Sequence, residues 1–130
     1  MFAVTLASAL TVLAAEGVDP NLDAYAWDAR PILVFAADGD PRLAEQLARF
    51  EAAAPELADR ENVVIVETEA DSRLSRSFRP GDFTVILIGK DGGEKFRANR
   101  LVAVEELNTL IDAMPMRRNE MRTKERRTAE

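Results

Sequence analysis

Three runs of apolar residues stand out along this chain of 130 residues. They are residues 32–36 (ILVFA), 63–66 (VVIV) and 83–88 (FTVILI), each bounded by polar or turn-forming residues. Short continuous runs rich in branched and aromatic side chains are typical of strands that are buried on both faces of a sheet. The pattern therefore predicts three central strands.

Two further segments carry apolar residues at helical spacing. The first begins at Pro41, where Asp40 can cap the helix N-terminus, and Pro55 ends or kinks it. Its apolar face is formed by Leu43, Leu47, Phe50 and Ala54. The second stops before Pro115, and its apolar positions are Val104, Leu107, Ile111 and Met114. A short helix is also expected within residues 72–78.

The order of these elements predicts the fold. A helix between two apolar strands forms a right-handed unit with parallel strands. After the third strand, the Asp-Gly turn in residues 90–93 predicts a hairpin, with residues 94–97 as an edge strand. The predicted fold is α/β: a thioredoxin-like (peroxiredoxin-like) three-layer sandwich over residues 18–116. Its mixed sheet has four strands, the first two parallel and the last two antiparallel.

Charge is divided unevenly along the chain. The formal net charge is −6, but residues 117–130 carry six Lys or Arg against three Glu, which leaves −9 for residues 1–116. An acidic body is repelled by phosphate backbones, so we expect no nucleic-acid binding. Residues 117–130 are predicted to be a basic, flexible tail that can contact an anionic membrane surface.

Residues 1–15 form an uncharged apolar run that ends in small residues. This composition predicts an export signal, cleaved after Val12-Leu13-Ala14 or Leu13-Ala14-Ala15, although a basic start is missing. We therefore expect a periplasmic or extracellular protein. An uncleaved membrane anchor and an element of the fold are the alternatives.

The chain contains no cysteine and no histidine, which excludes thiol redox chemistry and histidine-based catalysis. No catalytic residue, metal ligand or cofactor is assigned. In thioredoxin-like folds the reactive thiol lies before the first helix, where this chain has Asp38 and Asp40. These residues can cap the helix or, together with Asp82, form a cation or ligand site.

Two other groups of residues are candidates for contact with a partner. Trp27, with Tyr25 and Arg30, can form an aromatic and cationic binding surface or pack over the sheet edge. Arginines recur at Arg73, Arg76 and Arg79, where they can receive an anion or form a solvated face. The predicted ligand or partner residues are Trp27, Arg30, Asp38, Asp40, Arg79 and Asp82.

Several stretches together resemble one family. They are Leu22, Tyr25, Trp27 and Arg30-Pro31; residues 87–93 (LIGKDGG); and residues 111–118 (IDAMPMRR) with Glu120-Met121. Over roughly residues 22–121 the chain is similar to the P-DUDES domain family, which includes bacterial exported domains and a domain of animal sushi-repeat-containing proteins. The resemblance implies export, a thioredoxin- or peroxiredoxin-like fold and no established enzymatic activity.

Two function classes remain open. The first is an exported, non-redox thioredoxin-like module that binds a protein or small ligand in the cell envelope or serves a structural role. The alternative is a thiol-independent enzyme, peroxidase-like or hydrolytic, that uses the carboxylates of Asp38, Asp40 and Asp82.

Overall fold

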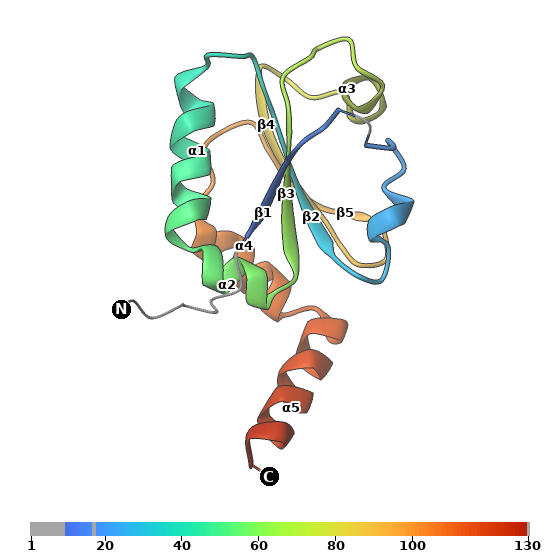
Figure 1. Ribbon diagram of the computed structural model, residues 1–130, viewed down its shortest axis with the longest axis vertical. Helices are drawn as coiled ribbons and strands as arrows, with labels where there is room; N and C mark the ends of the chain where they lie inside the picture. The colour runs from blue at the N-terminus through green and yellow to red at the C-terminus, as the bar shows by residue number, and fades with distance from the viewer. Residues whose placement is uncertain (1–9, 17, 130) are drawn as a thin grey trace, which may run out of the picture.

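A five-stranded mixed sheet forms the centre of the protein in the computed structural model, which describes residues 10–16 and 18–129 (Figure 1). The strands are β1 (Thr11–Ala14), β2 (Arg30–Ala36), β3 (Asn62–Glu67), β4 (Phe83–Ile88) and β5 (Glu94–Ala98). Their order across the sheet is β1-β3-β2-β4-β5. The first three strands are parallel, and β4 and β5 each run antiparallel to the neighbour before them in that order. The three predicted central strands and the hairpin are confirmed.

The predicted number of strands was wrong: the sheet has five strands instead of four. The additional strand, β1, comes from the segment for which we expected an export signal, and residues 1–9 of that segment lie outside the described residues. Strand β1 pairs with β3, with Val12 opposite Val64, yet the Val12 side chain is 42% exposed. The pairing of β1 does not test export, because a short apolar run can form a strand and can also be part of an export signal. Export therefore stays a prediction.

Helices cover both faces of the sheet. They are α1 (Pro41–Ala52), α2 (Ala54–Asp59), α3 (Arg73–Phe78), α4 (Val104–Asp112) and α5 (Pro115–Ala129), with a 3-10 turn, η1 (Asp23–Tyr25). Helices α1, α2 and α4 lie on one face, and α3 and η1 lie on the other, so the protein has three layers (Figure 1). Within the described ranges, none of these helices is long and apolar enough to cross a membrane.

Two apolar cores, one on each face of the sheet, explain the continuous apolar runs. Alternate side chains of β2 point to opposite faces, so Val34 packs with Phe50 and Leu107 while Leu33 packs with Leu74. All seven residues of β2 are buried. A strand with helices on both faces needs apolar side chains at successive positions, which is why no alternating pattern appears.

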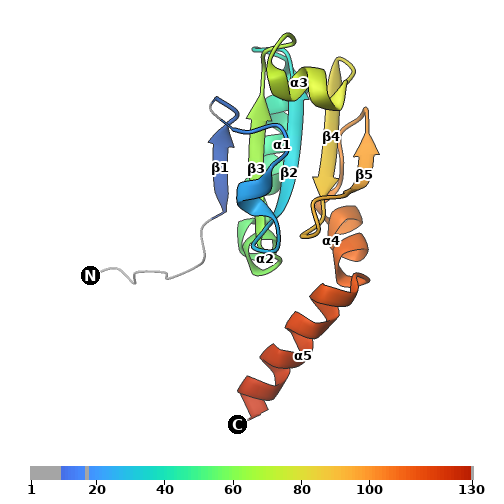
Figure 2. The same cartoon turned by 90° about the vertical axis from the view of Figure 1, so that its right-hand side faces the viewer.

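Residues 117–129, for which we expected a flexible tail, belong to helix α5 (Pro115–Ala129), and residue 130 lies outside the described residues. The helix extends away from the rest of the protein (Figure 2), and an ion pair between Lys124 and Asp59 joins its middle to the end of α2. The apolar residues of this segment do not form a stripe, so hydrophobic periodicity gave no signal for a helix. Ion pairs of Arg117 and Glu120, described below, attach it.

Candidate functional site

The carboxyl ends of β1, β3 and β2 meet at one edge of the sheet because the three strands are parallel. Helix α1 leaves the end of β2 on one face, whereas α3 follows β3 on the opposite face (Figure 1). Where successive connections leave on opposite faces, the loops separate and open a crevice, which is where open α/β sheets bind ligands. The topology therefore makes this edge the expected place for a ligand site.

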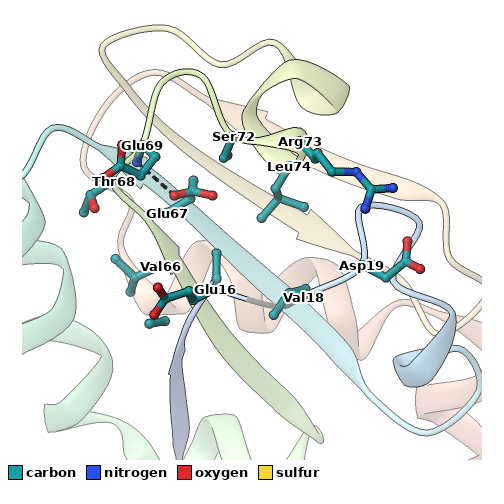
Figure 3. A pocket seen from close by; sticks show the side chains of 12 residues that line it. Glu16, Val18, Asp19, Val66, Glu67, Thr68, Glu69, Ser72, Arg73 and Leu74 are labelled. Atoms are coloured by element: carbon teal, nitrogen blue, oxygen red, sulfur yellow. Dashed lines mark hydrogen bonds between the residues drawn. The ribbon is translucent and has the colours of Figure 1, made fainter.

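Two adjoining hollows of about 590 and 620 Å³ lie at this edge and share Glu67, Thr68 and Glu69. We call them together the carboxyl-edge groove. The first hollow lies between the ends of β1 and β3 and the start of α3 (Figure 3). The second lies between the end of β2, the end of β3 and residues 79–82. Their volumes are those of sites for small ligands or short peptide segments.

Glu67, the last residue of β3, is the central polar group of the groove. Its side chain is 8% exposed and reaches into the space between Glu16 and Leu74 (Figure 3). One carboxylate oxygen, Oε2, accepts a hydrogen bond from the backbone N–H of Glu69 at 2.9 Å. No Lys or Arg in the described part of the chain forms an ion pair with Glu67. A buried acid with spare acceptor capacity is suited to a ligand that donates hydrogen bonds.

The wall of the groove beside α3 is fixed by polar contacts. The Ser72 hydroxyl oxygen caps α3 by accepting a hydrogen bond from the N–H of Ser75 at 3.0 Å. The Ser75 hydroxyl in turn donates to the carbonyl of Glu69 at 2.7 Å. These bonds join the loop after β3 to the helix that follows it, so the groove is preformed.

The opposite wall is the turn before β4. Arg79 ends α3 in a left-handed conformation, with φ of 50°, and its N–H donates to the carbonyl of Ser75 at 2.8 Å. The N–H of Gly81 donates to the Thr84 hydroxyl at 2.9 Å, and that hydroxyl donates to Asn99 at 2.8 Å. Two of the predicted residues, Arg79 and Asp82, line the groove in this turn and are exposed.

Asp40 caps α1 and lines neither hollow of the carboxyl-edge groove. Its Oδ1 accepts a hydrogen bond from the N–H of Arg42 at 2.9 Å, and its Oδ2 forms an ion pair with the Arg42 guanidinium at 2.8 Å. The side-chain hydrogen bond from Arg42, with the backbone bond beside it, lowers the pKa of Asp40. A carboxyl group held ionised in this way is a poor proton donor. The capping interpretation of Asp40 agrees with this geometry.

The cation site considered for Asp38, Asp40 and Asp82 does not form. Asp38 and Asp82 are exposed, and Asp38 does not line the groove. Among residues 10–16 and 18–129, no three acidic side chains come close enough together to hold a metal ion.

The other two predicted residues, Trp27 and Arg30, lie at the opposite end of the sheet, where β2 begins. Arg30 is 1% exposed, and its guanidinium makes two hydrogen bonds of 3.1 Å to the carboxylate of Glu120 on α5. Lys90, 7% exposed, bonds to the same carboxylate at 2.8 Å and to Glu61 at 3.0 Å. Two buried cations thus converge on one acid.

Arg117, also buried, extends these contacts to two other helices. It forms ion pairs with Asp59 at 2.7 Å and with Asp112 at 3.2 Å, at the ends of α2 and α4. We call Arg30, Lys90, Arg117 and Glu120 the amino-end ion cluster. Burial raises the pKa of Glu120, but the hydrogen bonds from Arg30 and Lys90 outweigh it, and the net pKa lies below the ordinary value.

Sequence reasoning singled out Arg30 but missed its partners and Glu67. Glu120 and Arg117 lie within the stretches that carry the family resemblance, and this was the one available signal. Nothing in the local sequence pairs Arg30 with a residue 90 positions away. Glu67 directly follows the apolar run of residues 63–66, but Glu16 and Asp38 follow apolar runs in the same way. The sequence therefore does not single out Glu67, and its burial at the end of β3 is visible only in the structure.

These features define a single α/β domain with a preformed groove and with neither thiol nor imidazole groups. A family model described as a domain of unknown function (DUF4174) matches residues 21–120, and the chain belongs to this family. The match begins after β1 and ends at Glu120, so it includes the whole amino-end ion cluster. Comparison with curated proteins finds no significant match.

Proposed function

We propose that the protein is an exported, thioredoxin-like binding module without redox activity, and that its ligand site is the carboxyl-edge groove. The order β3-β2-β4-β5, with the first pair parallel and the last pair an antiparallel hairpin, supports the thioredoxin-like assignment. The apolar composition of residues 1–15 supports export. The single observation that carries the binding role is Glu67, a buried acid without a cationic partner in a preformed hollow.

The charge of the groove indicates the ligand class. Five acids line the two hollows, Glu16, Asp19, Glu67, Glu69 and Asp82, against three arginines, Arg73, Arg76 and Arg79. The acid that is buried lies at the centre, whereas the arginines are exposed. A group that carries a positive charge and N–H donors, such as an ammonium or guanidinium, therefore complements the groove. The ligand is a basic peptide segment or a small amine.

Binding is favoured over the carboxylate-enzyme alternative. General acid catalysis needs a carboxyl group whose pKa is near the working pH, whereas the pKa of Asp40 is lowered by the hydrogen bonds from Arg42. Asp38 and Asp82 are exposed, and neither forms an acidic cluster with Asp40.

The proposal is tested by titrating the ¹⁵N-labelled protein with tetralysine, with tetraglutamate as the probe of opposite charge. We expect amide shifts from tetralysine at residues 35–37, 67–69, 79, 81 and 82, and none there from tetraglutamate. Glu67→Gln keeps the side-chain shape and removes the charge, and should weaken tetralysine binding about tenfold. Glu51→Gln, at an exposed position on α1, changes the net charge equally and is the matched control.

Two results would contradict the proposal. One is a set of tetralysine shifts scattered over the acidic surface and weakened equally by Glu67→Gln and Glu51→Gln, which indicates general charge attraction. The other is unchanged tetralysine affinity in Glu67→Gln. Export is tested separately, by the location of the protein in fractionated cells and the mass of its mature N-terminus.

A further inference from the structure

Trp27 combines two unfavourable features in one residue. Its side chain is 63% exposed, more than any other large apolar residue in the described ranges. Its backbone is left-handed, with φ of 67°, a region that bulky residues rarely occupy. A left-handed non-glycine residue costs on the order of 1–3 kcal/mol and is retained where the surroundings impose it, most often at functional sites.

Trp27 borders an apolar hollow of about 280 Å³ at the amino end of the sheet. Met114, which links α4 to α5, and Pro115 and Met116, at the start of α5, line it together with Trp27. Met116 is also 38% exposed. This volume accommodates one large apolar side chain, and a tryptophan beside methionines and proline is the composition of a binding hot spot. We call this site the Trp27 hollow.

The amino-end ion cluster holds the Trp27 hollow in place. The backbone N–H of Trp27 donates to the carbonyl of Lys90 at 2.6 Å. The Lys90 side chain is in turn fixed by Glu120 and Glu61. Because Arg30 bonds to the same Glu120, the strand, the hairpin and α5 around the hollow form one connected support. A partner that binds here finds its contacts already arranged, which lowers the entropy cost of binding.

Charge distinguishes this end of the protein from its acidic body. Six cations line the Trp27 hollow and the neighbouring hollow beside α5: Arg30, Lys90, Lys95, Arg117, Lys124 and Arg127. Four acids accompany them: Asp59, Glu61, Asp91 and Glu120. Arg30, Lys90 and Arg117 are buried and paired within the ion cluster, so they do not face a partner. Helix α5, whose first turn lines the Trp27 hollow, exposes five cations against one exposed acid, Glu125: Arg118, Arg122, Lys124, Arg126 and Arg127. The exposed surface of this helix is therefore basic, although the chain has a net charge of −6. Complementarity of charge favours an acidic partner.

We propose that the Trp27 hollow is a docking site for an acidic segment of another protein, which inserts one apolar side chain beside Trp27. The acidic residues of the partner lie against Lys95, at the rim of the hollow, and the exposed cations of α5. This site is at the opposite end of the sheet from the carboxyl-edge groove and does not depend on the function proposed for the groove.

Intrinsic fluorescence tests the proposal directly, because Trp27 is the only tryptophan in the chain. The probe is a capped pentapeptide with leucine at its centre and two glutamates on either side, added to the full chain. We expect a saturable blue shift of the emission as leucine covers the exposed indole. The same peptide with lysines in place of glutamates, and a pentaglutamate peptide without leucine, should bind at least about tenfold more weakly.

Two variants test whether the Trp27 ring itself binds the peptide. Binding is followed by the fluorescence anisotropy of the dye-labelled glutamate–leucine peptide. Trp27→Asn removes the ring but suits the left-handed backbone, so it should weaken binding about tenfold or more while the melting temperature stays equal or rises. Leu110→Asn, at an apolar position on α4 that is 37% exposed, should leave binding unchanged.

The role of charge is tested by a pair of matched substitutions. Lys95→Gln removes a rim cation from an i,i+4 pair with Asp91, and should weaken binding about threefold. Arg49→Gln removes a cation of similar exposure from an i,i+4 pair with Glu45 on α1, and should have no effect. Unchanged binding in Trp27→Asn overturns the proposal, and so does equal affinity for the lysine peptide. A blue shift with phosphatidylglycerol vesicles but not with the peptide also overturns it, because the surface would then bind membranes.

Discussion

The two ends of the sheet differ in whether their least exposed acid is paired with a cation. At the carboxyl end, Glu67 is buried without a cation and faces an open groove. At the amino end, Glu120 receives hydrogen bonds from both Arg30 and Lys90, and α5 closes over them. The two acids lie at opposite ends of the same sheet. The difference is that a helix supplies the acid at the amino end, whereas the diverging connections leave the carboxyl end uncovered.

Charged groups at the amino end therefore attach a helix, whereas the buried acid at the carboxyl end is available to a ligand. The charged side chains of the amino-end ion cluster form ion pairs with one another and with neighbouring acids. These ion pairs hold α5 in place and set the shape of the Trp27 hollow. The charge of Glu67 holds little in place, because its one hydrogen bond is to the neighbouring residue Glu69. Substitutions should therefore affect mainly stability at the amino end and mainly binding at the carboxyl end.

The largest expected effect on stability comes from Glu120→Ala. It leaves the buried side chains of Arg30 and Lys90 without their shared partner. Removing one member of a buried ion pair typically costs about 3–5 kcal/mol, and we expect about 3 kcal/mol because Glu120 is partly exposed. Urea unfolding followed by circular dichroism measures the loss. The exposed Glu125→Ala on the same helix is the control, and an equal effect of both substitutions would show that the cluster contributes nothing special.

Acid should weaken the same end of the protein. The pKa values of Glu120, Asp59 and Asp112 are lowered: burial opposes the shift in Glu120, and hydrogen bonds from Lys124 or Arg60 are the largest cause in the other two. Carboxyl groups with lowered folded-state pKa values stabilise the fold fully above the unfolded values of about 4, and lose this as pH falls through the folded values.

The free energy of unfolding should therefore fall below about pH 5, and the fall should be shallower in Glu120→Gln, which has one fewer acid to protonate. Urea unfolding at pH 7, 5 and 3.5 for both proteins measures the difference. Parallel curves for the two proteins would mean that Glu120 does not contribute to the acid sensitivity.

The elements that pack by apolar contacts could be predicted from the sequence, and those that pack by charge could not. Strands β2, β3 and β4 and the faces of α1 and α4 follow from apolar spacing. Helix α5 could not be predicted, because Arg117 and Glu120 attach it by pairing with residues that are distant in the chain. The carboxyl-edge groove was not predicted: Arg79 and Asp82, which line it, were candidates in two separate groups of residues. Glu67, its central residue, is defined by burial that appears only when β3 enters the sheet.

The smallest expected effect on stability comes from removing β1, and this deletion tests whether β1 is part of the folded domain. Deleting residues 1–15 removes β1 and the wall that Ala14 and Ala15 contribute to the groove, and leaves β3 as an edge strand. Because Val12 is largely exposed, we expect a loss of only about 1–2 kcal/mol. Amide hydrogen exchange should quicken in β3 but not in β2 or β4, which keep both neighbours. The response to Glu120→Ala should persist unchanged, since the ion pairs of the amino-end ion cluster connect β2, the hairpin and helices α2, α4 and α5 and do not involve described residues of β1. If the shortened chain unfolds altogether, β1 is part of the folding unit, and cleavage after Ala14 or Ala15 could not yield a stable protein.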